Sequence, residues 1–324
     1  MQQLNKNQKQ YDTNLPWVEK YRPKNIDDVL HPPITKFIND LMNNDFLPHM
    51  IFYGVAGTGK TSTIFAIANE YFQGEANKYV LELNASDDRG ISVVRSQIKE
   101  FCQLQIIKKP GINIKYKLVI LDEADALTDD AQGALRRIIE TYTFNTRFCL
   151  ICNYLSKLID AILSRSLVII FPKISNKVMK EAITKISKKE NIKLNPEQIR
   201  NIIFTSNGDL RKGINLLQNM CLSDNYSAIE LQLSSIIKII DYIKENTLLD
   251  SYNEFIKVRN IENFSISDFL NKLLNYILEN YIDIPNINKC IIQLAQIEKN
   301  ALIGSIEKIH ICAIISTLKE FFSN

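Results

Sequence analysis

The segment GVAGTGKTS, residues 54–62, has the spacing of a phosphate-binding loop, GxxxxGK[ST]. Its glycines let backbone N–H groups converge on phosphate oxygens, while Lys60 supplies positive charge and Thr61 offers a hydroxyl to Mg²⁺. A chance glycine-rich loop is the alternative, but an apolar run precedes the segment and the helix-like run IFAIA follows it, as the motif requires. The residues expected to bind ATP here are Gly54, Val55, Ala56, Gly57, Thr58, Gly59, Lys60, Thr61 and Ser62.

An acidic pair follows the apolar run in KLVILDEAD, residues 117–125. At the carboxyl edge of a parallel sheet, Asp122 would hold Mg²⁺ through water and Glu123 would act as general base on the attacking water. Two adjacent acids can also be a helix cap, which a nearby phosphate-binding loop makes the weaker alternative. Asn153, after the next apolar run, is a candidate to orient the same water. These residues predict Mg²⁺-dependent hydrolysis of a nucleoside triphosphate.

Two arginines lie apart from this cluster in the sequence. Arg211 follows Asn207-Gly208 on the first turn of an expected helix, where it could contact the nucleotide or be a solvated cation. Arg165 lies between two serines in AILSRS, at the end of a helix that we predict over residues 154–163. We expect Arg165 on the opposite flank of the domain from Lys60. The simplest role there is a favourable interaction with the dipole of its own helix.

The order of the predicted elements indicates how these residues are positioned. Short apolar runs separated by helix-period segments predict a parallel α/β sheet wound with helices. Three short helices follow in residues 174–222, and the chain is helical beyond about residue 235. The predicted divisions are a polar tail (1–14), an α/β core (15–173), a small helical lid (174–234) and an all-α C-terminal domain (235–324).

Composition adds limits to these expectations. The 324 residues are 46% hydrophobic and carry a formal net charge of +3, which is too small to indicate nucleic-acid binding without local clustering. The first residues lack the apolar core of a signal peptide, and we expect no membrane span. Six scattered cysteines suit a reducing compartment. Cys149 and Cys152 form a CxxC that is either a metal or redox site or, more simply, part of a buried strand.

A set of motifs together resembles the AAA+ ATPases and, within them, the small subunits of eukaryotic replication factor C. The motifs are LPWVEKYRP (15–23), GTGKTS (57–62), LELNASDDRGISVVR (81–95), LDEADALTDDAQGALRR (121–137), NTRFCLICNYLSKLIDAILSR (145–165) and NGDLR (207–211). The chain departs from that family at Val55 and Ala56, where two prolines are usual, and at Ser166, where a cysteine is usual. The resemblance implies an AAA+ core, a lid and a C-terminal collar that forms the oligomer.

The resemblance also implies partners and residue roles. The family is a nuclear heteropentamer that loads the sliding clamp PCNA onto primer–template DNA in replication and repair. Arg165 would be an arginine finger that acts in trans on the ATP of a neighbouring subunit. Gln132, with either Arg136 or Arg137, would relay DNA or clamp contact to the phosphate site. The residues expected near the adenine are Val18, Tyr21 and Arg22, although an ordinary N-terminal packing motif would have the same sequence pattern. Those expected on the DNA backbone are Arg89, Arg95 and Lys99, although taken alone they would be a solvated face.

Three functions remain distinguishable at this point. The chain is either a clamp-loader subunit that hydrolyses ATP or a structural subunit that binds ATP and turns it over little. A branch-migration or helicase-loading motor of the same class is the third alternative, which the motif combination disfavours. Because half of each site would belong to a neighbour, the solitary chain is expected to hydrolyse ATP poorly.

Overall fold

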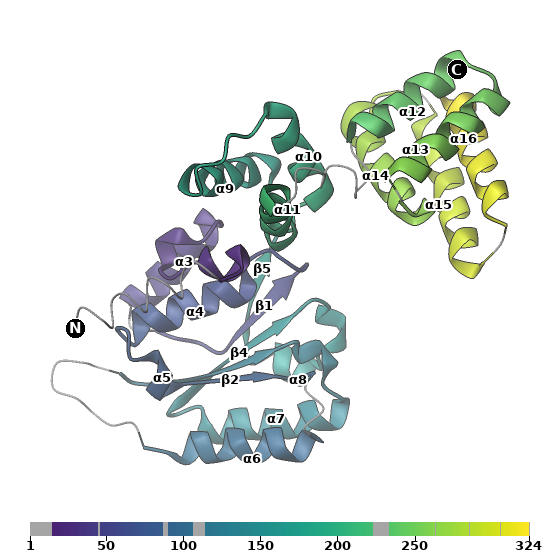
Figure 1. The fold of residues 1–324 in the computed structure, drawn as a ribbon. Coiled ribbons are helices and arrows are strands. Elements are labelled where there is room, and N and C mark those ends of the chain that lie inside the picture. The colour runs from purple at the N-terminus through teal and green to yellow at the C-terminus, as the bar shows by residue number, and fades with distance from the viewer. Residues whose placement is uncertain are drawn as a thin grey trace. The chain divides into compact units, whose positions relative to one another are not determined.

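The computed structural model (Figure 1) describes residues 15–44, 46–86, 90–105, 114–222, 233–262, 264–284, 286–304 and 306–323. Predictions that concern the polar tail 1–14 and Arg89 lie outside the described residues. The described chain up to Ala182, together with Gly208–Ile214, forms one compact unit, and Ile183–Asn207 with the chain from Asn215 onward forms a second. The predicted domain boundaries remain a prediction.

The first unit is built on a single parallel sheet. Its strands are β1 (Met50–Gly54), β2 (Val80–Asn84), β3 (Lys117–Asp122), β4 (Thr146–Cys152) and β5 (Leu167–Phe171). They are ordered β2-β3-β4-β1-β5, and all of the pairs are parallel. The carboxyl ends of β3, β4 and β1 therefore lie next to one another at one edge of the sheet, where ligands of such folds bind.

Helices cover both faces of this sheet (Figure 1). Among the described residues, the α-helices that lie wholly within the unit are α2 (Trp17–Lys20), α3 (Pro32–Asn43), α4 (Lys60–Tyr71), α5 (Ala76–Tyr79), α6 (Gly90–Gln103), α7 (Asp129–Tyr142) and α8 (Asp160–Leu163). The short 3₁₀ helices are η1 (Ile26–Asp28), η2 (Ala124–Ala126) and η3 (Leu155–Lys157). Helix α7 begins as its sequence dictates, because the Thr128 hydroxyl accepts a bond from Ala131 N and two acidic residues follow in the first turn.

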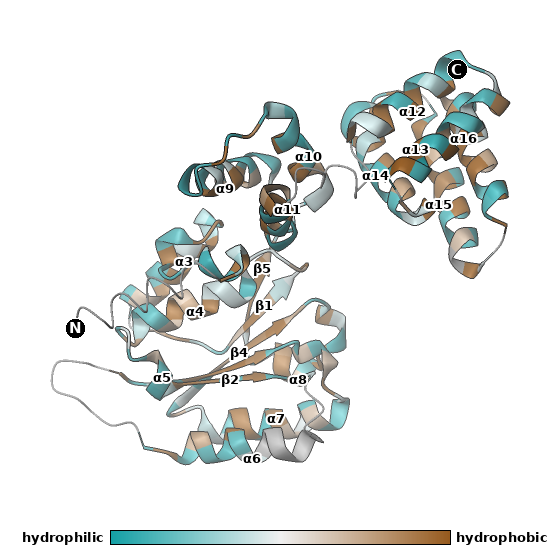
Figure 2. Cartoon of the chain, viewed as in Figure 1, coloured by the Kyte–Doolittle hydropathy of each residue, from teal (hydrophilic) through white to brown (hydrophobic). Residues whose placement is uncertain are grey.

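Alternation along the strands makes two hydrophobic cores. Phe52 of β1 packs with α3 and α4 on one face, whereas its neighbour Ile51 packs with α6 and α7 on the other. Most strand residues are hydrophobic in Figure 2, as expected when both faces of a parallel sheet are covered, whereas the edge strand β2 also contains Glu82 and Asn84. This covered sheet holds the ends of β1, β3 and β4 rigidly in place.

The remaining helices are α9 (Asn176–Lys189), α10 (Pro196–Ser206), α11 (Leu210–Leu222), α12 (Leu233–Glu245), α13 (Leu248–Glu262), α14 (Ile266–Asn280), α15 (Ile287–Ile303) and α16 (Glu307–Ser323). The three helices expected in residues 174–222 are present, and Asn195 begins α10 with a capping box that includes Gln198. Helices α12 to α16 share one core in which Phe255 and Phe269 are fully buried. The predicted α/β fold with helical C-terminal parts is confirmed.

One predicted helix is wrong. Residues 154–163 form η3 and the four-residue α8, separated by extended backbone at Leu158 and Ile159. The physical reason is the side chain of Gln132, which accepts a bond from Ile159 N and donates one to Lys157 O. These backbone groups are therefore drawn out of a helical ladder.

Candidate nucleotide-binding site

The phosphate-binding loop connects β1 to α4, as the motif predicts. Gly59, immediately before α4, has φ +93°, and Gly57 has φ +69°, a region that glycine enters without steric cost. Gly54 is also constrained by space, because a Cβ there would lie 2.3 Å from the Phe171 carbonyl oxygen of β5. These three glycines allow the loop to turn between the sheet and the helix.

Lys60 connects this loop to the end of β4. Its Nζ donates to the carbonyl oxygens of Gly54 at 2.7 Å and Val55 at 2.8 Å, and to Asn153 Oδ1 at 2.9 Å. Burial lowers the pKa of Lys60, Asp122 opposes that shift, and the positive charge of Arg211 adds to it. The structure thus brings together Lys60 and Asn153, two residues 93 positions apart.

Thr61 connects the same loop to the end of β3. Its hydroxyl donates to Asp122 Oδ2 at 2.9 Å. Hydroxyl and carboxylate oxygens are the hard ligands that Mg²⁺ takes, so the donor set at this position fits a magnesium ion. Both sequence-predicted metal ligands are therefore adjacent in the structure.

Glu123 lies at the turn that ends β3. Its backbone has φ +53°, an uncommon conformation for a residue other than glycine, and its side chain is exposed. Its N–H donates to Asp122 Oδ1 at 2.9 Å, while Asp125 of the same motif accepts from Tyr154 N at 3.2 Å. This turn directs the chain away from the sheet and positions Glu123 directly after the carboxylate that bonds Thr61.

The start of α11 approaches the phosphate-binding loop within the same unit. Leu210 N donates to Gly57 O at 3.1 Å, and a Cβ at Gly57 would lie 1.7 Å from Asp209 Oδ1. Arg211, in the first turn of α11, is exposed and close enough to Lys60 to lower its pKa. The NGDLR motif and the GTGKTS motif are thus neighbours, which their separation in sequence does not reveal.

His31 is a member of this site that sequence reasoning missed. The residue precedes α3, is buried, and its Nε2 lies 2.8 Å from Thr58 O. Because a carbonyl only accepts, Nε2 carries the proton of a neutral ring, and burial lowers the pKa of His31. Its ring also meets Phe171 edge-on. His31 belongs to none of the motifs noted in the sequence, so nothing there indicated this contact.

The N-terminal residues pack beside the helix that follows the loop. Arg22 lies over the Phe65 ring of α4, 5.9 Å from its centroid, and pairs with Glu19 at 2.8 Å. Val18 and Tyr21 are half-buried. Their predicted contact with adenine stays a prediction.

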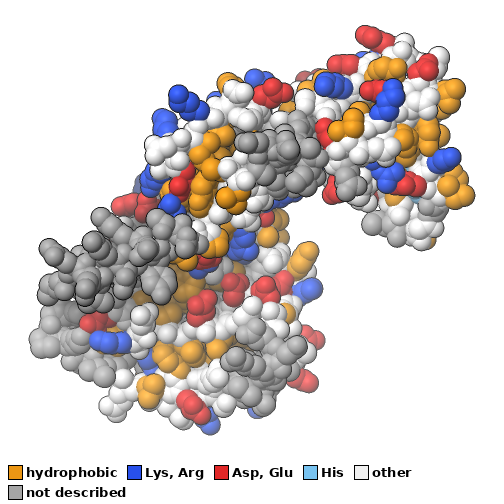
Figure 3. Space-filling view, viewed as in Figure 1, with side chains coloured by type: hydrophobic (Ala, Val, Ile, Leu, Met, Phe, Trp, Pro, Cys, Tyr) orange, Lys and Arg blue, Asp and Glu red, His pale blue; other side chains and the backbone are white. Residues whose placement is uncertain are grey.

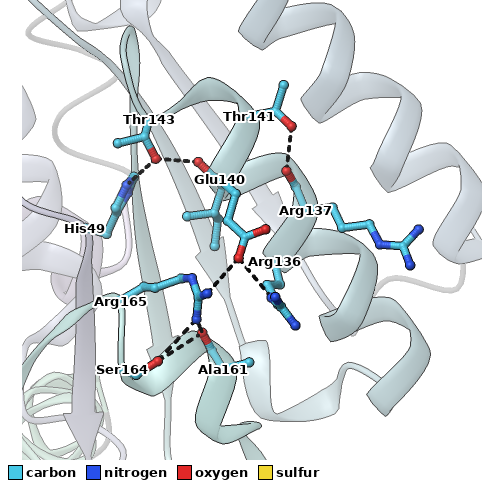
Figure 4. Close-up of polar contacts among 10 residues, drawn as sticks. His49, Arg136, Arg137, Glu140, Thr141, Thr143, Ala161, Ser164 and Arg165 are labelled. Carbon is cyan, nitrogen blue, oxygen red and sulfur yellow. Dashed lines mark hydrogen bonds and ion pairs between the residues drawn. The ribbon is translucent and has the colours of Figure 1, made fainter.

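Arg165 bonds to groups of α7 and α8 (Figure 4). Its Nη2 lies 2.7 Å from Glu140 Oε1 of α7, and its Nη1 donates to Ala161 O at 2.7 Å. The expectation of a role in trans remains untested by these contacts.

Gln132 is fully buried beneath the same region. Its Nε2 donates to Leu127 O at 3.1 Å and Lys157 O at 2.8 Å, and its Oε1 accepts from Ile159 N at 2.9 Å. The side chain therefore links α7 to the η3–α8 segment that carries Arg165. Its three bonds are all to backbone.

The helix predicted to contact DNA is α6. Lys99 is exposed on it, and Arg95 belongs to the same helix although its side chain lies outside the described residues. Buried Lys117 of β3 anchors the carboxyl end of the helix by donating to the carbonyls of Cys102 at 2.9 Å and Leu104 at 2.5 Å. A cation at this end also suits the helix dipole.

The CxxC in β4 is structural. Cys149 belongs to the core on the α4 face and Cys152 to the core on the α7 face, so the two thiols point to opposite sides of the sheet. Burial raises the pKa of Cys152 to about 11. Burial also raises the pKa of the Cys149 thiol well above its ordinary value. The metal and redox interpretation of this pair is therefore wrong.

The parallel sheet, the phosphate-binding loop and the carboxylate at the neighbouring strand end define a P-loop ATPase of the AAA+ class. Residues 50–173 match the model of the ATPase family associated with various cellular activities (AAA), and residues 181–222 match the RCF1/5-like AAA+ ATPase lid domain. The chain belongs to the replication factor C small subunits, the ATPases of the clamp loader.

That assignment rests on relatives that match along nearly the whole chain. The probable replication factor C subunit 5 of Dictyostelium discoideum is 39% identical over 95% of this chain and 91% of the relative. Replication factor C subunit 5 of Homo sapiens is 37% identical over 94% of this chain and 92% of its own length. Subunit 3 of Saccharomyces cerevisiae is 37% identical over 98% and 96%.

A solved structure supports the fold. The RuvB Holliday junction branch migration motor of Thermotoga maritima superposes with a TM-score of 0.52 at 16% identity, covering 79% of this chain and 91% of that one. This likeness concerns the fold alone and does not favour the branch-migration alternative. Among the described residues, no helix has the length and apolar character that crossing a bilayer requires.

Proposed function

We propose that this chain is a hydrolysing subunit of a nuclear replication factor C heteropentamer that loads PCNA onto primer–template DNA during replication and repair. The observation that carries the proposal is the pair of bonds from the phosphate-binding loop to the neighbouring strand ends, Lys60 to Asn153 and Thr61 to Asp122. A subunit that only binds ATP would use the same contacts, and Glu123, directly after Asp122, adds the carboxylate that hydrolysis requires. The family assignment supplies the clamp-loading context.

Lys60 and Thr61 would hold the triphosphate. The three N–H donors of Lys60 now serve Gly54, Val55 and Asn153, and phosphate oxygens would take over part of these bonds when ATP binds. Thr61 and Asp122 would hold Mg²⁺, Asp122 through water. The ion, when bound, would neutralise charge on the β- and γ-phosphates.

Glu123 and Asn153 would act on the attacking water. Glu123 follows Asp122 directly and is exposed at the edge of the sheet, where it would accept the proton of the water as general base. Asn153, whose Oδ1 accepts from Lys60, would use its remaining amide donors to orient the same water. Arg211 would contribute positive charge beside Lys60 from the start of α11.

Arg165 would complete the site of a neighbouring subunit. Its guanidinium is held by groups of α7 and α8. Its charge would stabilise the transition state at a γ-phosphate bound by another chain, and arginine fingers increase the rate of such hydrolysis by about 10³–10⁵-fold. Val18, Tyr21 and Arg22 would lie near the adenine. Arg89, Arg95 and Lys99 would contact the DNA backbone, and such contacts carry no sequence preference.

The C-terminal helices would hold the ring together. Large hydrophobic side chains are exposed there, as Figure 3 shows for the visible face; they are Leu249, Ile261, Ile282, Ile292, Ile303, Ile306 and Ile309. Exposed hydrophobic side chains such as these would be buried by contact with another chain. We assign them to contact with other replication factor C subunits.

The decisive experiment compares hydrolysis by the complex containing Glu123→Gln in this chain alone with that of the unaltered complex, in the presence of clamp and primed DNA. The steady-state rate of ATP hydrolysis should fall by the amount that this chain's site contributes to the total, while ATP binding by the complex persists. Glu181→Gln, an exposed acid on α9, is the matched control. Unchanged turnover by the Glu123→Gln complex would favour the structural-subunit alternative.

A further inference from the structure

Glu140 is the meeting point of two arginines at the edge of the core (Figure 4). Its Oε1 lies 2.7 Å from Nη2 of Arg165 and 3.0 Å from Nε of Arg136, one helical turn earlier on α7. The hydrogen bond from Arg136, with the positive charge of both arginines, holds the pKa of Glu140 below its ordinary value. The Glu140 carboxylate is therefore ionised at neutral pH.

The guanidinium of Arg165 is held from more than one side. Nη1 donates to Ala161 O at 2.7 Å and to Ser164 Oγ at 3.3 Å, while Nη2 bonds Glu140. Ala161 and Ser164 lie in and just after α8, whereas Glu140 comes from α7. Among the described residues, the Nε–H and the second Nη2–H of Arg165 donate to no other group, so the guanidinium retains donors for a ligand.

We propose that Glu140 is a positioning residue for Arg165: it fixes the guanidinium in the orientation that a neighbouring subunit's γ-phosphate requires. The inference rests on the proposed role of Arg165 in trans. A flexible arginine on a surface must give up rotamer freedom when it meets its ligand, and a side chain that is already held loses less. Glu140 would thus contribute by preorganisation.

The charges favour positioning over sequestration. One carboxylate faces two guanidinium groups, so Glu140, Arg136 and Arg165 together keep a net positive charge that still attracts phosphate. Arg136 also competes for Oε1, which weakens the hold on Arg165 without removing it. A carboxylate that blocked Arg165 would instead neutralise it alone and occupy more of its donors.

The test uses the reconstituted complex with variants in this chain only, namely Glu140→Ala, Glu140→Gln, Arg165→Ala and the double variant Glu140→Ala/Arg165→Ala. We expect Glu140→Ala to lower kcat for ATP hydrolysis roughly two- to fivefold with KM unchanged, the scale of an exposed ion pair. Glu140→Gln keeps an acceptor oxygen and should recover much of kcat. In the Arg165→Ala background, Glu140→Ala should have no further effect.

Thr141→Ala is the matched control, because Thr141 is the next residue of α7 and its hydroxyl, within the described part of the chain, bonds only the Arg137 carbonyl, at 2.8 Å (Figure 4). It should leave kcat unchanged. If Arg165→Ala lowers kcat but Glu140→Ala does not, or if the two losses multiply in the double variant, the positioning role is refuted while the trans role stands. If Arg165→Ala itself has no effect, the proposed function of Arg165 fails first.

Discussion

Replacement of Gln132 by leucine should destabilise the first unit through three identifiable backbone groups. Leucine has a similar volume and would fill the fully buried site, but Leu127 O, Lys157 O and Ile159 N would lose their side-chain partner. A typical intramolecular hydrogen bond contributes about 1 kcal/mol, so the three together contribute about 3 kcal/mol. For a unit of this size that loss lowers the melting temperature by about 6–12 °C.

The single tryptophan of the chain makes this measurement specific. Trp17 belongs to the first unit, so its fluorescence during thermal unfolding reports on that unit and not on the C-terminal helices. Gln103→Leu, the same chemical change at an exposed position at the end of α6, should leave the midpoint nearly unchanged. A shift below about 2 °C for Gln132→Leu would refute the reasoning, since it would mean that water or local rearrangement replaces all three bonds.

Three further predictions concern the loop and the core. Gly57→Ala should weaken ATP binding about tenfold, because φ +69° costs alanine about 1–2 kcal/mol and its Cβ would collide with Asp209. Titration with a fluorescent nucleotide measures the affinity, and adding Asp209→Ala should relieve only the collision. His31→Leu leaves Thr58 O unpaired and should weaken ATP binding by a similar factor, with recovery in His31→Gln; equal affinities would contradict the proposed support. Burial and the positive charge of Arg147 lower the pKa of His49 from 6.5 to about 4. The unfolded chain therefore takes up the proton first, and the free energy of unfolding should fall by at most about 3 kcal/mol as the pH drops through this interval. Unfolding midpoints measured against pH should depend less on pH in His49→Gln than in the unaltered protein.

The parts of the fold that follow local rules were predictable from the sequence. The run LVIIF forms β5 at Leu167–Phe171, and KLVILD, the start of a longer predicted run, forms β3. A strand covered on both faces is continuously apolar, so its extent is visible in the sequence without any knowledge of its neighbours. The phosphate-binding loop was equally visible, because its glycines and Lys60 are required at fixed spacing by the geometry of one turn.

The contacts that position the site were not predictable, because they join residues that no local pattern relates. His31 meets Thr58 across 27 positions, and Gln132 meets Lys157 across 25. The second pair also explains the failure at residues 154–163: their apolar spacing is that of a helix, but a buried amide bonds their backbone more favourably than a helical ladder would. Helical periodicity describes which side chains are buried and cannot by itself determine where the backbone bonds are made.

Long-range hydrogen bonds connect the two roles proposed for this chain, ATP binding at its own site and the action of Arg165 at a neighbouring subunit's site. Asn153 directly follows β4 and accepts from Lys60, and the segment after it is fixed by Gln132 before the chain reaches Arg165. Loss of the bond between Gln132 and Ile159 N would therefore displace Arg165 and its support on Glu140 while leaving the bonds of Lys60 and Thr61 within the loop intact. It follows that Gln132→Leu, studied below its unfolding temperature, should impair hydrolysis at the neighbouring subunit's site more than it impairs ATP binding by this chain.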